Sequence, residues 1–183
     1  IITIGKTHQT ELAFSGLGVN PKTATPPNSK SKLLAPGGSS SGAAVATALS
    51  LSSAGVGSDT GGSVRQPAAF CGIYGLKPSY GRISRYGLVA HASSFDTIGI
   101  MSKSILDVYN TFCTISGRDQ KDSTSVDVSV PKIPSFKDSK LPKSVGIVSD
   151  KILKNINVDI AESYRQLVAV SYTHLTLPTT SPV

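Results

Sequence analysis

The most informative stretch of this chain is rich in glycine and hydroxyl side chains: Gly57-Ser58-Asp59-Thr60-Gly61-Gly62-Ser63-Val64-Arg65-Gln66-Pro67. Two adjacent glycines directly before Ser63 let the backbone turn sharply and approach the serine closely. Such a turn can direct several backbone N–H groups at one point beside the hydroxyl, which is how an oxyanion site is built. Asp59 and Arg65 flank the serine with opposite charges, and we expect them to pair and hold the loop rigid.

A second serine cluster, Gly37-Gly38-Ser39-Ser40-Ser41-Gly42, lies upstream. Its serines can cap a helix of small side chains over residues 43–49, and a strand over 51–56 would then deliver the loop at 57–67. One helix and one strand are enough to return the chain alongside Ser39. Because no histidine lies in a triad context, the two clusters point to a Ser–Lys type of activation, in which a neutral lysine takes a proton relayed through a second serine.

Other motifs fit these glycine-rich segments less well. The segment 38–42 matches Gly-x-Ser-x-Gly, but a nucleophile elbow needs a buried strand immediately before it, and a Lys/Ser-rich loop with Pro36 comes first. The triplet Gly5-Lys6-Thr7 resembles the end of a phosphate-binding loop, yet the strand-like residues 1–4 occupy the place of the flexible loop. We therefore expect neither site.

The rest of the chain alternates short apolar runs with amphipathic segments, which predicts an α/β fold. Ser104 and Asp107 form a capping-box pattern before an amphipathic helix, and Gly117 follows its end. Strands are predicted at residues 1–4, 51–56, 73–76, 96–101 and 144–148, and helices at 8–20, 43–49, 105–115 and 158–170.

With 183 residues, the chain has room for one domain or part of one. Residues 118–143 carry three prolines and are predicted to form an internal connector. Residues 171–183 are rich in Thr and Pro and do not continue the pattern of the preceding helix. We expect them to be a non-native tail and exclude them from the fold prediction.

The net charge is +7 and the isoelectric point is about 9.5. This charge would suit an anionic partner such as RNA, although many lysines are concentrated late in the chain, where a solvated surface explains them equally well. Two cysteines among apolar neighbours, Cys71 and Cys113, form neither a disulfide framework nor a metal-ligand spacing. We expect both thiols to be buried, and we expect neither a metal site nor a membrane span. Unpaired thiols also suit a reducing compartment, so we expect the protein in the cytoplasm or, in a eukaryote, in the mitochondrion.

The residues Pro36–Gly42 followed by Gly57–Ala69 resemble the amidase signature family. The resemblance covers residues 1–170 and implies the central part of an amidase domain, with a mixed sheet core flanked by helices. It also implies amide hydrolysis by a Ser-cisSer-Lys mechanism, with Ser63 as the nucleophile and Ser39 as the bridging serine. The implied oxyanion hole consists of the backbone N–H groups of Thr60, Gly61, Gly62 and Ser63.

The resemblance assigns no catalytic lysine within the chain. In the family this lysine lies upstream of the position that matches Ile1, whereas Lys6 and Lys77 match other lysines of the family. We therefore expect the chain to lack its general base and to have little or no activity on its own.

Three segments are similar to the A subunits of glutamyl-tRNA(Gln) amidotransferases: Gly75–Ala90, Ala92–Gly99 and Asp122–Ser125. Such enzymes hydrolyse glutamine and pass the ammonia to a partner subunit, which amidates Glu on tRNA. This similarity implies subunits B and C as partners, Glu-tRNA(Gln) bound through the complex, and glutamine as the amide substrate. It implies no cofactor in this subunit of the enzyme, since ATP and Mg²⁺ would be used by the partner subunit.

The segment His8–Gly16 departs from that subgroup and is more similar to stand-alone amidases. It lies near the substrate pocket in the family, which makes Phe14 a candidate substrate-binding residue. This departure leaves open a stand-alone amidase acting on another small carboxamide. The net positive charge leaves open a second alternative, a non-catalytic scaffold that binds RNA through the basic surface.

Overall fold

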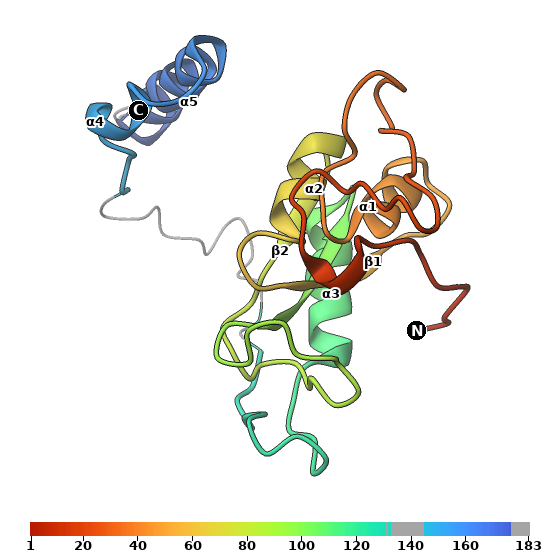
Figure 1. Cartoon of the computed structure of the whole chain (residues 1–183). Coiled ribbons are helices and arrows are strands. Elements are labelled where there is room, and N and C mark those ends of the chain that lie inside the picture. Colours follow the sequence, from red (N-terminus) through yellow and green to blue (C-terminus); the bar gives the residue numbers. More distant parts are fainter. Residues whose placement is uncertain (131, 133–144, 177–183) are drawn as a thin grey trace. The chain divides into compact units, whose positions relative to one another are not determined.

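The computed structural model describes residues 1–130, 132 and 145–176, and the side chains of residues 174–176 lie outside this description. The chain divides into two compact units, Ile1–Pro131 and Lys132–Val183, each of which can be described by itself (Figure 1). The first unit contains the small sheet, its helices and both serine clusters.

The sheet of the first unit has three strands in the order β1-β3-β2. They are β1 (Gly55–Asp59), β2 (Tyr74–Leu76) and β3 (Thr97–Ser102), and β3 pairs antiparallel with both neighbours. The register places Asp59 opposite Thr97 and Gly75 opposite Met101. Five of the six residues of β3 are buried, because this strand is covered on both faces and on both edges.

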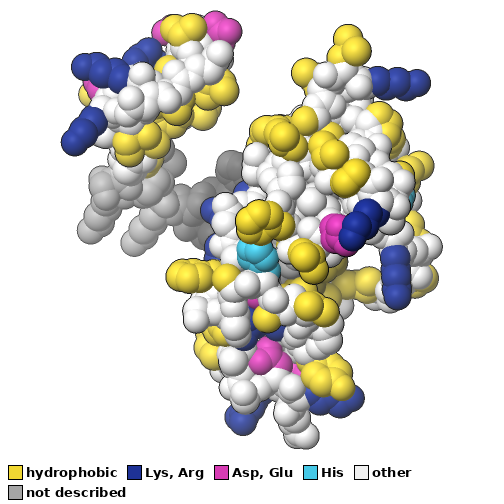
Figure 2. Space-filling view, in the orientation of Figure 1, with side chains coloured by type: hydrophobic (Ala, Val, Ile, Leu, Met, Phe, Trp, Pro, Cys, Tyr) yellow, Lys and Arg dark blue, Asp and Glu magenta, His cyan; other side chains and the backbone are white. Residues whose placement is uncertain are grey.

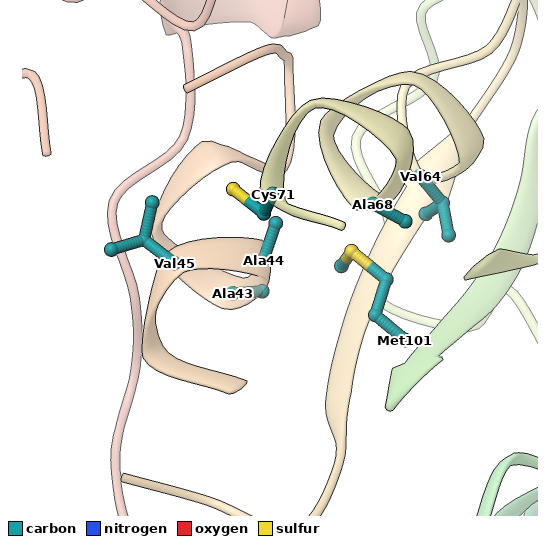
Figure 3. Close-up of a cluster of buried hydrophobic side chains, with 7 residues drawn as sticks. All are labelled: Ala43, Ala44, Val45, Val64, Ala68, Cys71 and Met101. Atoms are coloured by element: carbon teal, nitrogen blue, oxygen red, sulfur yellow. The ribbon is translucent and has the colours of Figure 1, made fainter. Parts of the chain in front are cut away.

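Helices cover the sheet on both faces. Since successive side chains of a strand point to opposite sides, Met101 and Ile100 of β3 reach different clusters. Met101 packs with α1 (Ser41–Ala48) and α2 (Arg65–Cys71), as Figure 3 shows for Ala44, Ala68 and their neighbours. Ile100 packs with Val108 of α3 (Ile105–Ile115). These helices around a sheet confirm the predicted α/β fold.

Helix α3 begins and ends as its sequence predicts. The Ser104 hydroxyl accepts a hydrogen bond from the Asp107 N–H (3.3 Å), which is one half of the predicted capping box. The N–H of Ser104 instead donates to the hydroxyl of Ser102 at 3.3 Å, so β3 supplies the second half. Gly117 follows the C-cap with a φ of +132°, a conformation that favours glycine.

Part of the predicted connector is integrated into the first unit. The Asp122 carboxylate accepts from the Arg85 N–H at 2.8 Å, and the Val126 N–H donates to the Gly81 carbonyl at 2.9 Å. Residues 118–130 therefore pack against residues 81–85. Residues 131 and 133–143 of the predicted connector lie outside the described residues.

The second unit contains α4 (Asp150–Leu153) and α5 (Val158–Thr176). Among the described residues of this unit, Leu153 and Ala161 are the buried apolar ones. The predicted strand at 144–148 is wrong for residues 145–148, which have no strand structure; Ser144 lies outside the described residues. The predicted end of the last helix is also wrong, since α5 continues to Thr176, and extending a formed helix costs much less than starting one.

Two predictions for the start of the chain are wrong. Residues 1–4 are exposed and form no strand among the described residues. Residues 8–20 contain only a short 3₁₀ helix, Glu11–Ala13, because tertiary hydrogen bonds hold the flanking backbone: Thr10 N–H donates to the Ser39 carbonyl (2.9 Å), and Gly38 N–H to the Gly16 carbonyl (2.8 Å).

The predictions around the serine loop are partly wrong. Strand β1 starts at Gly55 instead of residue 51 and extends to Asp59, so it contains the first part of the loop. Helix α2 was not predicted. Pro67 is nevertheless compatible with it, because proline occupies the third position of the helix, in the first turn, where a backbone N–H has no intrahelical partner. Cys71 is buried as predicted, but Cys113 on α3 is exposed.

Candidate active site

The two serine clusters lie side by side in the structure. Ser40 precedes α1, and Ser63 lies in the turn between β1 and α2. The Ser40 N–H donates to the Ser63 carbonyl at 3.1 Å, and the Ser40 hydroxyl donates to the Ser58 carbonyl at 3.4 Å. Gly57 permits this approach, because a Cβ at this position would overlap the Ser40 hydroxyl.

Ser39 lies in the interior of the site. The Gly38–Ser39 peptide bond is cis, and the Ser39 carbonyl accepts a hydrogen bond from Thr10 N–H (2.9 Å). The Ser39 side chain is fully buried, and its hydroxyl has no hydrogen-bond partner among the described residues. Ser63 is only partly buried. An accessible serine thus lies beside a buried serine whose hydroxyl is free to bond another group.

Asp59 organises the turn that carries Ser63. Its buried carboxylate accepts backbone N–H bonds from Gly62 (2.8 Å), Val64 (3.1 Å) and Arg65 (3.2 Å). It also forms a two-point ion pair with the Arg65 guanidinium, at 3.1 Å from Nε and 2.9 Å from Nη2. Burial by itself would raise the pKa of Asp59, but the Arg65 side chain and the backbone donors outweigh it and lower that pKa.

One of the four expected oxyanion donors is engaged elsewhere. The Gly62 N–H points to Asp59, so it is not free for a substrate oxygen, and Gly62 has a φ of +131° that favours glycine. A buried carboxylate requires hydrogen-bond donors, and the turn brings the Gly62 N–H within reach of the Asp59 carboxylate. Among the described residues, the N–H groups of Thr60, Gly61 and Ser63 have no hydrogen-bond partner. These three remain candidate donors.

Asp96 is a site residue that sequence reasoning missed. It is buried just before β3, and its carboxylate accepts the Thr60 hydroxyl at 2.5 Å. It also accepts the N–H groups of His91 (2.9 Å) and Ala92 (3.0 Å). Burial would raise the pKa of Asp96, but the Thr60 hydroxyl and these backbone donors lower it. The only signal in the sequence was its place within the segment Ala92–Gly99.

The substrate-binding candidate Phe14 is on the surface of the first unit. Its side chain is 80% exposed, and its ring lies against His91, with ring centroids 5.7 Å apart. The His91 N–H is bound to Asp96, whose carboxylate holds Thr60. Phe14 is therefore connected to the serine loop through two intervening residues.

Neither lysine of the matched motifs bonds a site serine. The Lys77 ammonium donates to the Pro78 carbonyl at 2.8 Å. Lys6 lines a surface cavity of about 480 Å³ together with His8 and Gly42. Among the described residues no lysine donates to Ser39 or Ser63, and no group of three or more His, Cys, Asp and Glu could hold a metal ion.

Comparison with known proteins decides the family. The family model described as Amidase matches residues 1–171. The chain belongs to the amidase family. A curated relative of this amidase-family chain is the A subunit of the glutamyl-tRNA(Gln) amidotransferase from Picosynechococcus sp., 40% identical over 172 residues, which are 92% of this chain and 36% of the relative.

Solved structures agree with this assignment. The A subunit of the Thermotoga maritima glutamyl-tRNA(Gln) amidotransferase is 43% identical with a TM-score of 0.67, covering 70% of this chain and 28% of that one. A structure described as amidase is 30% identical with a TM-score of 0.76, covering 91% and 35%. The amidase-family chain thus spans about a third of the length of these relatives. Within its described residues no helix is both long and apolar enough to cross a bilayer.

Proposed function

We propose that a full-length protein carrying this chain hydrolyses a carboxamide, with Ser63 as the nucleophile. The observation that supports this most is the hydrogen bond from Ser40 N–H to the Ser63 carbonyl, which brings both serine clusters together. In support, the hydroxyl of Ser39 is buried without a hydrogen-bond partner among the described residues, and Ser63 is accessible. The N–H groups of Thr60, Gly61 and Ser63, which lack a hydrogen-bond partner within the described part of the chain, belong to the same turn.

In the proposed reaction the Ser63 hydroxyl oxygen attacks the amide carbonyl carbon. The hydroxyl proton passes through Ser39 to a general base, for which the family mechanism uses a lysine. The N–H groups of Thr60, Gly61 and Ser63 are the proposed donors to the oxyanion, and each such donor contributes about 3 kcal/mol of barrier lowering. The C–N bond then breaks, the proton goes to the leaving nitrogen, and water hydrolyses the remaining ester to an acid and free Ser63.

We propose glutamine as the amide, with ammonia passed on for the amidation of Glu on tRNA(Gln). The support is the identity to A subunits of glutamyl-tRNA(Gln) amidotransferases. Subunits B and C are then the proposed partners, with Glu-tRNA(Gln) bound through the complex and with ATP and Mg²⁺ used by the partner subunit. Such a complex would work in the cytoplasm or the mitochondrion, where tRNA is charged.

A stand-alone amidase is a second candidate. It is favoured by the exposed Phe14, in the segment that departs from the A subunits, and by the likeness to a structure described simply as amidase. An RNA-binding scaffold has less support, because Lys and Arg side chains stand apart on the visible face of the first unit (Figure 2).

The test is the substitution Ser63→Ala in the full-length protein, with the exposed Ser94 changed to Ala as the control. We expect Ser63→Ala to abolish ammonia release from glutamine and labelling by a fluorophosphonate probe, and Ser94→Ala to leave both unchanged. Ammonia release from other carboxamides but not from glutamine would favour the stand-alone amidase. Amide hydrolysis that persists in Ser63→Ala would overturn the assignment of the nucleophile.

A further inference from the structure

We propose that Asp96 is a positioning residue for this reaction, which acts by holding Thr60 and thereby the free N–H groups of Thr60 and Gly61 beside Ser63. The inference rests on the proposed function, because it assigns those N–H groups to the oxyanion. Asp96 itself is not expected to touch the substrate.

The sheet explains why Asp96 reaches Thr60. Asp59 ends β1 and lies opposite Thr97, which begins β3. In an antiparallel pair the next residue of one strand lies opposite the previous residue of the other, so Thr60 faces Asp96. The contact between the Thr60 hydroxyl and the Asp96 carboxylate (2.5 Å) thus continues the strand pairing with side chains.

Two carboxylates divide the loop between them. Asp59 binds the N–H groups of Gly62, Val64 and Arg65, all in the second half of the turn. In the first half, a Cβ added at Gly61 would meet nothing within 4 Å, and its N–H is free among the described residues. Within the described part of the chain, the bond from the Thr60 hydroxyl to Asp96 is therefore the hydrogen bond that holds the residues Thr60 and Gly61 in place.

Asp96 is itself held firmly. It is buried, and the N–H groups of His91 and Ala92 donate to its carboxylate. Its own N–H donates to the Ala92 carbonyl at 3.0 Å. A carboxylate with its pKa lowered in this way is ionised at neutral pH and only accepts hydrogen bonds, so the Thr60 hydroxyl is oriented as the donor.

The role is positional because the charge itself is unfavourable. A negative charge near a developing oxyanion raises the free energy of that oxyanion. The benefit of Asp96 must therefore come through the geometry of the N–H donors, whose placement within a fraction of an ångström sets the rate. This makes the contribution of Asp96 dependent on Thr60.

The kinetic test is a double-mutant cycle in the full-length protein, with Thr60→Val, Asp96→Ala and both together. We expect each single variant to lower kcat by about tenfold or more with little change in KM, and the double variant to be no worse than Asp96→Ala, because the two act as one unit. Thr60→Ser keeps the hydroxyl and should restore most of kcat. Asp119→Asn, which removes a similar charge bonded to the Ser84 hydroxyl at 2.6 Å, serves as the control and should leave kcat unchanged.

A second measurement on the chain itself does not depend on amidase activity. Thr60→Val should lower the NMR order parameters of the backbone amides of Thr60 and Gly61 while leaving those of β3 unchanged. Unchanged order parameters in the loop, or kinetic effects that simply add in the double variant, would overturn the inference. If the wild-type protein hydrolyses no amide, the proposed function fails, and the order parameters still decide whether Asp96 holds the loop through Thr60.

Discussion

The backbone N–H of Ser40 donates a 3.1 Å hydrogen bond to the carbonyl oxygen of Ser63, although α1 and β1 separate the two residues in the chain. Each serine cluster therefore fixes the position of the other. The nucleophile candidate depends on how closely β1 approaches the start of α1, which is a matter of packing within the first unit.

This approach makes Gly57→Ala a destabilising substitution. The added Cβ would overlap the Ser40 hydroxyl, and overpacking of this kind costs about 1–3 kcal/mol. Urea unfolding of the chain should show the loss. Gly61→Ala is the matched control from the same loop, since its Cβ would meet nothing within 4 Å. Equal losses for the two variants would contradict the close fit at Gly57.

Ser39→Ala and Ser41→Ala separate a catalytic hydroxyl from a merely buried one. Both hydroxyls are buried without a hydrogen-bond partner among the described residues, so removing either should change the free energy of unfolding little. In the full-length protein, Ser39→Ala should lower kcat for amide hydrolysis by about 10²–10⁴-fold, because the proton relay is lost. Ser41→Ala should keep its kcat. Similar kcat values for both variants would remove Ser39 from the mechanism.

Asp59 should make the chain sensitive to acid. Its pKa is lowered from the ordinary 3.8, so its contribution to stability is present above that value and is lost as the pH falls through the lower, folded-state pKa. Asp59→Asn should therefore reduce the free energy of unfolding at pH 7 and flatten its decline in acid. The measurement is urea unfolding across pH 2–7. A variant with the wild-type slope would argue against the Asp59–Arg65 pair as the cause.

The cap of α3 gives a prediction remote from the site. Ser104→Ala removes the acceptor of the Asp107 N–H and should cost about 1 kcal/mol of stability. Thr114→Ala in the last turn of the same helix is the control, because its exposed hydroxyl bonds the Asn110 carbonyl within that helix and caps no helix end. Thermal unfolding of the chain should show a lower Tm for Ser104→Ala alone.

Local signals predicted the elements that depend on local interactions. The capping residues and the apolar spacing of residues 105–115 predicted α3, and the short apolar runs predicted β2 and the start of β3 within a residue or two. The amidase resemblance of Pro36–Gly42 and Gly57–Ala69 was equally readable, because each motif is continuous in the chain, and the family match confirms it.

Other elements required contacts that no local pattern contains. The segment 8–20 has the composition of a short helix, but hydrogen bonds from Thr10 and to Gly16 hold it against the serine cluster in an irregular form with one short 3₁₀ helix. Tertiary contacts of this kind override intrinsic propensity, which amounts to less than about 1 kcal/mol per residue. Helix α2 was missed because Pro67 indicates a loop. Proline is compatible with a helix only when it lies in the first turn, and the position of that turn was not evident from the sequence.

The family, the α/β class and the two candidate serines could be predicted from the sequence, since they follow from continuous motifs and periodic patterns. The folded structure, in contrast, was needed to show which groups are already engaged in hydrogen bonds. It assigned the Gly62 N–H to Asp59, left the Ser39 hydroxyl unpartnered among the described residues, and brought Asp96 to Thr60. Strand pairing brings together residues that are far apart in the chain, and hydrogen-bond partners are chosen among whatever lies within about 3 Å in the folded protein.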